Sequence, residues 1–138
     1  MQSTLKAATT APLIQGSQKT RPISEESLFL SIVIPAYNEE EVLPEFHQRL
    51  SRVFESIAAK VEFIYVNDGS TDNTLDIMHG LRQTDSRVAI VDLSRNFGKE
   101  IALTAGLDHA RGDAAVILDS DLQHPPELIP ELIKHWRE

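Results

Sequence analysis

Residues 116–123 read VILDSDLQ, a β-branched apolar run that ends in two carboxylates two positions apart. If residues 114–118 form a buried strand, Asp119 and Asp121 lie at its carboxyl end, where the backbone leaves the sheet. Residues i and i+2 of an extended chain point to the same side, so the two carboxylates converge. Hard oxygen ligands of this kind suit Mg²⁺ or Mn²⁺ held between a protein and a diphosphate. A solvated acidic turn is the alternative that this stretch alone leaves open.

Three further apolar runs precede this one and give the chain a βαβ rhythm. Strands are predicted at residues 28–34, 61–66, 88–93 and 114–118, and each is followed by a segment with helical spacing. This alternation predicts an α/β fold, with a parallel sheet of about four strands, right-handed crossovers and helices on both faces.

Local signals set the expected element boundaries. Pro35 should end the first strand, because it cannot donate to a ladder, so that residues 35–39 form a loop. Asn38 is expected to cap the next helix, with acidic residues near its positive end. The helix over residues 99–110 is rich in Ala, Ile and Leu and should be well buried, with Gly112 as its C′ residue. A last helix opens at Pro125 and Pro126. Its expected apolar face consists of Leu128, Ile129, Leu132, Ile133 and Trp136.

Composition excludes several classes of protein. The chain has 138 residues, a formal net charge of −8 and no cysteine. The acidic balance argues against a nucleic-acid binder, and the absence of cysteine excludes disulfides and thiolate sites. No apolar run approaches the roughly 18 residues of a spanning helix, and no signal-peptide core is present. We therefore expect a soluble, intracellular chain in which residues 1–27, rich in polar and small residues, form a disordered tail.

Polar clusters follow the carboxyl ends of all four predicted strands. These ends share one edge of a parallel sheet, which is where ligands bind in open α/β folds. Residues 37–39, 67–68, 95–99 and 119–123 should therefore line a single crevice. The chain has neither a Gly-x-Gly-x-x-Gly turn nor a phosphate-binding Gly-Lys-Ser/Thr loop, so phosphate charge would be met by a metal and by Lys or Arg.

The motifs, taken in order, resemble those of inverting family 2 glycosyltransferases, which have the Rossmann-like GT-A fold. They are IVIPAYNE at residues 32–39, VNDGSTD at 66–72 and DSDLQ at 119–123. SRNFGKE at 94–100 and LQHPPE at 122–127 are similar to the polyprenyl-phosphate branch, which includes dolichol-phosphate mannose synthases and bactoprenol glucosyltransferases. The resemblance implies that residues 28–138 are the donor-binding part of such a domain, truncated at the C-terminus.

The resemblance also implies roles for individual residues. Asp119 and Asp121 would be the catalytic Asp-x-Asp pair and, with Gln123, would hold the metal. Many relatives have two aspartates where this chain has Asn67 and Asp68, a position that would meet the uracil or guanine edge. Arg95 is a further candidate diphosphate contact. The implied nucleotide-sugar contacts are Pro35, Ala36, Tyr37, Asn38, Glu39, Asn67, Asp68, Lys99, Asp119 and Ser120.

The implied function is metal-dependent transfer of a sugar from a UDP- or GDP-sugar to a polyprenyl phosphate, with inversion at the anomeric carbon. The full-length enzyme would associate with the cytoplasmic face of a membrane, and a homo-oligomer is left open. Three alternatives remain. They are a nucleotide-binding fragment without catalysis, a soluble family 2 glycosyltransferase acting on a cell-wall or surface polysaccharide, and an acidic receiver-type signalling module.

Overall fold

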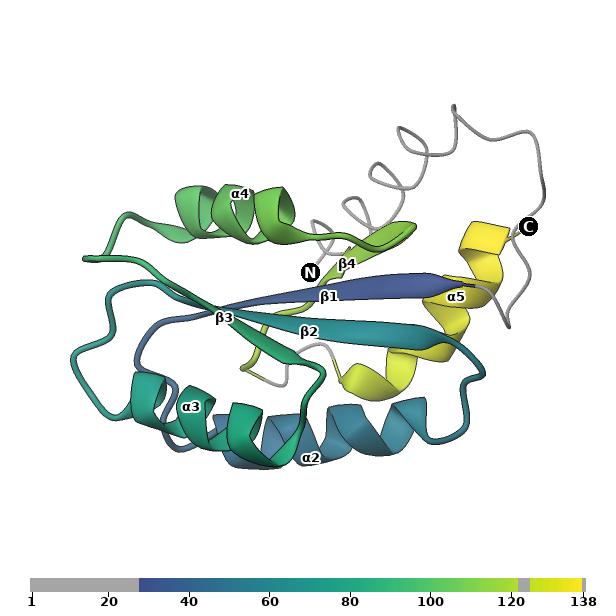
Figure 1. Ribbon diagram of the computed structural model, residues 1–138, viewed down its shortest axis with the longest axis horizontal. Helices are drawn as coiled ribbons and strands as arrows, with labels where there is room; N and C mark the ends of the chain where they lie inside the picture. The colour runs from purple at the N-terminus through teal and green to yellow at the C-terminus, as the bar shows by residue number, and fades with distance from the viewer. Residues whose placement is uncertain (1–27, 122–124, 138) are drawn as a thin grey trace.

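The computed structural model describes residues 28–121 and 125–137, and within them four parallel strands form one sheet in the order β3-β2-β1-β4 (Figure 1). The expected α/β class and parallel sheet are therefore confirmed. The strands are β1 (Phe29–Ala36), β2 (Lys60–Asn67), β3 (Val88–Asp92) and β4 (Ala114–Ile117). The helices are α2 (Leu43–Phe54), α3 (Thr74–Thr84), α4 (Lys99–His109) and α5 (Ile129–Arg137), with a 3₁₀ turn, η2 (Pro126–Leu128), before α5. The tail predicted at residues 1–27 lies outside the described residues.

Helices cover both faces of the sheet, as expected, and each face has its own core. Figure 1 shows α4 on one face and α2 and α3 on the other. Ile32 and Ile34 of β1 belong to the larger core, into which α2 contributes Phe46. Val33, between them in sequence, belongs to the smaller core beneath α4 with Ala102. This alternation explains why the strands read as continuous apolar runs, because both faces of each central strand are buried.

β1 extends two residues beyond its expected end, so the prediction that Pro35 begins a loop is wrong. Pro35 pairs with Val66 of β2 within the parallel ladder. The backbone groups of Ala36 face β2, since its carbonyl accepts from the Asp68 N–H. By alternation those of Pro35 face β4, whose pairing with β1 ends at Val33. The missing N–H of the proline therefore falls beyond the end of that ladder, where a proline is tolerated.

Two expectations about helices are also wrong. In α4 only Ala102 and Gly106 are buried, and Ile101 is 51% exposed, so the helix packs along one narrow stripe. Gly112 is not a left-handed cap: a Cβ there would lie 2.7 Å from the Phe29 carbonyl oxygen, so close packing on β1 explains the glycine. Of the predicted face of α5, Ile129 and Ile133 are buried, Leu132 and Trp136 pack partly against the core, and Leu128 is exposed.

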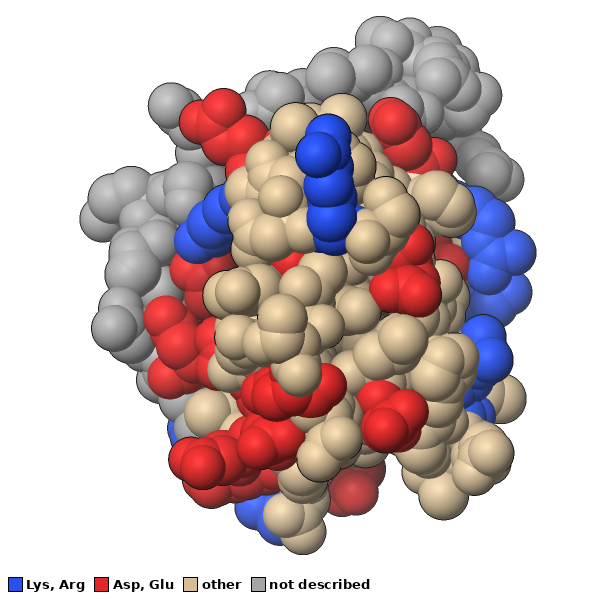
Figure 2. All heavy atoms as spheres, turned by 90° about the vertical axis from the view of Figure 1, so that its left-hand side faces the viewer, with Lys and Arg blue, Asp and Glu red and all other residues tan. Residues whose placement is uncertain are grey.

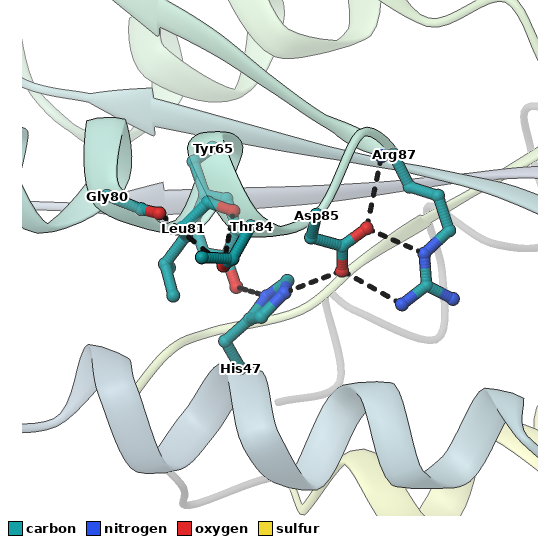
Figure 3. Close-up of polar contacts among 7 residues, drawn as sticks. All are labelled: His47, Tyr65, Gly80, Leu81, Thr84, Asp85 and Arg87. Atoms are coloured by element: carbon teal, nitrogen blue, oxygen red, sulfur yellow. Dashed lines mark hydrogen bonds and ion pairs between the residues drawn. The ribbon is translucent and has the colours of Figure 1, made fainter.

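A buried polar chain joins α2 to β2 and to the end of α3 (Figure 3). His47 contacts the Tyr65 hydroxyl through Nδ1 at 2.7 Å and the Asp85 carboxylate through Nε2 at 2.9 Å. Arg87 donates to both oxygens of Asp85. Burial lowers the pKa of His47, and the neighbouring Asp85 opposes this without cancelling it. The sequence offered no sign of this network, because its members are far apart along the chain.

We expect the stability of the chain to fall between pH 7.5 and pH 5.5. Because the folded pKa of His47 lies below its unfolded value, the unfolded state binds the proton more readily. The contribution of His47 to the free energy of unfolding is complete above the unfolded pKa of about 6.5. Below that pH it declines by at most about 1.4 kcal/mol per pH unit. Denaturant unfolding at several pH values measures this. His47→Gln should flatten the slope, whereas His79→Gln, at an exposed position, should leave it unchanged.

Candidate donor-binding site

The order in which strands are added to the sheet changes direction at β1. From β1 the strands proceed through β2 to β3 on one side, and β4 then pairs on the other side of β1. A cavity of about 180 Å³ opens at the carboxyl ends of these two strands. Such a reversal is the usual position of a ligand site in this class of fold. The cavity is lined by Pro35, Ala36, Tyr37, Glu39, Asp68, Lys99, Asp119, Ser120 and Asp121.

The cavity therefore brings together residues from the ends of β1, β2 and β4 and from the start of α4, which the sequence predicted to share one crevice. Figure 2 shows this edge of the molecule, where acidic side chains are prominent and the cationic ones lie mostly toward the margins of the view. Ligand pockets usually measure about 300–1,000 Å³, so the described residues enclose only part of the volume that a nucleotide sugar needs.

The loop after β1 is fixed by Asn38, which does not cap α2. The structure places the N-cap of α2 at Val42, without a side-chain cap bond. Asn38 instead has a left-handed backbone with φ of 53°, and its side-chain oxygen accepts the Thr71 N–H at 2.8 Å. The Glu39 N–H donates to the Thr74 hydroxyl. These bonds tie the loops after β1 and β2 together, and they leave the Tyr37 ring 45% exposed at the cavity.

Asn67, the last residue of β2, and Asp68, which follows it, were predicted to meet a base, and both are bonded within the fold. The Asn67 amide donates to the Asp92 carboxylate and accepts the Ser70 N–H, and its side chain is not part of the cavity lining. Asp68 does line the cavity, but its carboxylate also accepts the N–H groups of Phe97 and Gly98. Asp68 is therefore the anchor of the loop after β3.

That loop delivers Lys99 to the cavity. Gly69 packs against it with φ of 68°, so closely that a Cβ would lie 2.2 Å from the Arg95 carbonyl carbon. Lys99 then begins α4, and its ammonium forms an ion pair with Asp119 at 2.9 Å. The Arg95 guanidinium stacks over the Phe97 ring and does not line the cavity.

The turn after β4 supplies hard oxygen ligands. Asp119 and Asp121 both line the cavity, and the hydroxyl of Ser120 between them is buried with no partner among the described residues. Burial raises the pKa of Glu39, and the neighbouring charges of Asp121, Asp72 and Asp119 raise it further, so this end of the cavity favours a cation. Gln123 and its neighbour His124 lie outside the described residues.

The carboxylates at this turn suit a metal ion whose coordination shell is completed by oxygen atoms of a bound ligand. Within the described ranges, no three His, Cys, Asp or Glu side chains are grouped closely enough to hold an ion by themselves. Mg²⁺ commonly takes one or two carboxylates and completes its shell with phosphate oxygens and water. Asp119 and Asp121 would provide such a pair, and the Ser120 hydroxyl is a further polar atom with no hydrogen-bond partner among the residues that the structure describes.

Thr74 is a site-forming residue that sequence reasoning missed. Its hydroxyl accepts a hydrogen bond from the Glu39 N–H and donates one to the Asp72 carboxylate. Thr74 therefore links the loop after β1 to the loop after β2. The only local signal was the Ser/Thr/Asp-rich turn before α3, which marks a helix start but not a contact 35 residues away.

The sequence model of Glycosyl transferase family 2 matches residues 31–138. Among curated proteins, an uncharacterized glycosyltransferase, YkcC, of Bacillus subtilis is 51% identical over 108 residues, which cover 78% of this chain and 33% of that protein. A prophage bactoprenol glucosyl transferase homolog of Escherichia coli is 46% identical over 108 residues, which cover 78% of this chain and 35% of that protein. The chain thus spans about a third of the length of the curated relatives it matches.

A solved structure is similar over nearly the whole chain. The mannosyltransferase PcManGT from Pyrobaculum calidifontis, in complex with GDP-Man and Mn²⁺, superposes with a TM-score of 0.64 at 25% identity. The match covers 96% of this chain and 41% of that one. Among the residues that the present structure describes, no helix has both the length and the apolar composition needed to cross a bilayer.

Proposed function

The chain belongs to glycosyltransferase family 2, and we propose that it binds the nucleotide-sugar donor of an enzyme that transfers a sugar from a UDP- or GDP-sugar to a polyprenyl phosphate. One observation carries the proposal: motif residues from the ends of β1, β2 and β4 and from the start of α4 line one cavity. That cavity lies where the strand order changes direction, between β1 and β4. The bactoprenol glucosyl transferase homolog supports the lipid acceptor, and the complex of the mannosyltransferase supports a nucleotide-sugar donor.

The proposed donor contacts divide between the two sides of the cavity. Tyr37 and Asp68 lie on the side of β1 and β2, where the exposed phenol ring offers a surface for a base or ribose. Lys99 and Asp119 lie where α4 approaches the turn after β4. The ammonium of Lys99 would move from Asp119 to the diphosphate when the donor binds, because phosphate oxygens form strong charge-assisted bonds.

Asp119 and Asp121 would hold Mg²⁺ or Mn²⁺ against the diphosphate. The Mn²⁺ in the mannosyltransferase complex supports this assignment. When bound, such an ion neutralises the charge that develops on the departing nucleoside diphosphate. Lys99, which lies beside Asp119, would add to that neutralisation. The Ser120 hydroxyl, buried and unpartnered in the described part of the chain, would donate to a donor oxygen.

A phosphate acceptor needs no general base from the protein, because its attacking oxygen is already ionised. A phosphate monoester has a second pKa near 6 and is mostly dianionic at pH 7. One of its oxygens would attack the anomeric carbon opposite the bond to the diphosphate. A single displacement of this kind inverts the configuration, and the protein contributes by holding the reactants in line. The full-length enzyme would work at the cytoplasmic face of a membrane, next to its lipid acceptor.

Donor binding by this chain can be measured directly. We expect calorimetric titration to show binding of either UDP or GDP that strengthens at least about ten-fold when Mn²⁺ is added, since the ion bridges carboxylate and phosphate. Equal affinity with Mn²⁺ and with a chelator would remove the metal from the proposal. No binding of UDP, GDP or their sugars under any condition would contradict the donor site itself.

A second candidate is nucleotide binding without catalysis, favoured by the observation that the chain spans about a third of the curated relatives. Incubation of the chain with labelled nucleotide sugar and polyprenyl phosphate separates the two, because a binding fragment yields no glycolipid. A parallel incubation with a cell-wall polysaccharide tests the other alternative within the family, a soluble enzyme that glycosylates a cell-wall or surface polysaccharide.

A further inference from the structure

A second cavity, of about 450 Å³, lies at the opposite edge of the sheet from the donor site. It opens beside the first residues of β1 and β2, where the lining includes Phe29 and Lys60. The first and last residues of β1 are seven steps apart, so at about 3.3 Å per step the two edges lie roughly 23 Å apart. The second cavity is therefore separate from the nucleotide-sugar site and cannot share its ligand.

Three cationic side chains line this cavity, although the chain as a whole is strongly acidic. They are Lys60, Arg87 and Arg111, and the acidic residue of the lining is Glu62. Glu62 is 5% exposed and accepts bonds from the Ser31 hydroxyl and from the backbone and guanidinium of Arg111. Arg111 is thus ion-paired with Glu62, and Arg87 is ion-paired with Asp85, so the surplus positive charge at the cavity comes from Lys60.

The cations are held in place rather than left to move freely. The Lys60 ammonium lies 5.0 Å from the centre of the Phe29 ring, and the Arg87 guanidinium lies 4.9 Å from that of the buried Phe63. Arg87 is also bonded to Asp85, as Figure 3 shows. Cation–π contacts and ion pairs of this kind reduce the entropy that a ligand must remove when it binds.

Both arginines bond their carboxylates through the same edge of the guanidinium. Arg87 uses Nε and Nη2 toward Asp85, and Arg111 uses Nε and Nη2 toward Glu62. Within the described residues, Nη1 of neither side chain has a hydrogen-bond partner, and Lys60 takes part in no ion pair. Each cation thus retains donors for a further acceptor, and oxygen atoms of an anion would satisfy them.

We propose that this cavity is a second binding site, which takes a phosphate group carried on an apolar body. The phosphate would lie among Lys60, Arg87 and Arg111, which all line the cavity. The apolar part would lie against Phe29 and Phe54, which also belong to the lining. The same chemistry occurs in a soluble phosphate ester and in an anionic lipid headgroup, and the experiment below distinguishes these sources. The inference is independent of the proposed transferase activity.

The test follows backbone amide signals by NMR while inorganic phosphate, and then a water-soluble short-chain phosphatidic acid, is added to the whole chain. We expect shifts at Arg87 and Arg111 that saturate, with tighter binding of the phosphatidic acid than of inorganic phosphate. Lys60→Gln should weaken this binding about ten-fold, since one charge-assisted contact is lost. Lys134→Gln, which removes an exposed lysine on α5, changes the net charge equally and should leave the affinity unchanged.

Each outcome bears on the proposal. Equal weakening by the two lysine variants, or shifts confined to Lys99 and residues 119–121, would overturn it. To identify the source, vesicles of phosphatidylcholine with and without phosphatidic acid are compared in a flotation assay. Lys60-dependent flotation with phosphatidic acid supports a lipid headgroup, and saturation by a soluble phosphate ester without flotation supports a soluble ligand. Unfolding curves of both variants confirm that Lys60→Gln leaves the fold intact.

Discussion

Replacing Asp121 with Ala is expected to abolish sugar transfer by the full-length protein, with a loss of at least about 100-fold. Asp121 lines the donor cavity at the end of β4, and its charge raises the pKa of Glu39, so it contributes directly to the negative field there. A metal that neutralises a leaving diphosphate is worth several kcal/mol in the transition state, and each 1.36 kcal/mol is a factor of ten in rate. Transfer of labelled sugar to polyprenyl phosphate measures the effect.

Asp108→Ala is the matched control for this experiment. Asp108 is an exposed carboxylate in the last turn of α4, so its removal changes net charge by the same amount without touching the cavity. Loss of a negative charge near a helix C-terminus should not destabilise the chain. In calorimetry, Asp121→Ala should also remove the enhancement of nucleotide binding by Mn²⁺. Undiminished turnover of Asp121→Ala, or equal losses in both variants, would contradict the proposed role.

The crevice was predictable because it depends on connectivity more than on contacts. Four apolar runs separated by helical segments require parallel strands, and parallel strands place their carboxyl ends at one edge. Asp119, Asp121, Tyr37 and Lys99 were therefore expected at the same edge of the sheet. The strand order β3-β2-β1-β4 did not follow from the same signals, because periodicity does not say on which side of β1 the last strand pairs.

The individual roles of the two asparagines were not predictable, because each depends on a distant partner. Asn38 looked like a helix cap from its local sequence, yet its side-chain oxygen is bonded to the N–H of Thr71, 33 residues away. Asn67 is bonded to Asp92 in the neighbouring strand. An amide side chain both donates and accepts, so local sequence allows many partners and tertiary structure selects one.

Helix α4 shows the limit of reading burial from composition. Its sequence is rich in Ala, Ile and Leu, a composition that favours a buried helix. Within the described structure only a stripe containing Ala102 and Gly106 meets the sheet, and Gly106 is there because a Cβ would lie 2.4 Å from Val33. Close packing of the helix on the strand thus requires small residues. Composition alone does not reveal which side of α4 packs on the sheet.

The second large effect is expected at Gly69, where replacement by Ala should damage both stability and donor binding. Ala in the left-handed region costs about 1–2 kcal/mol, and overpacking adds about 1–3 kcal/mol. The clash here is with the backbone of Arg95 and Asn96, which cannot rotate away as a side chain can. The displaced loop is the one that Asp68 anchors and that precedes Lys99, so nucleotide affinity should fall about ten-fold or more.

Gly80→Ala is the control that isolates this cause. Gly80 lies exposed in α3, and a Cβ there would meet nothing within 4 Å. Alanine is favoured over glycine in a helix by about 0.5–1 kcal/mol, so this variant should be more stable than the parent chain and should bind nucleotide equally well. Denaturant unfolding and calorimetry on both variants give the comparison. If Gly69→Ala matched Gly80→Ala in either measurement, the contact between the loops after β2 and β3 would not be what fixes Lys99 at the site.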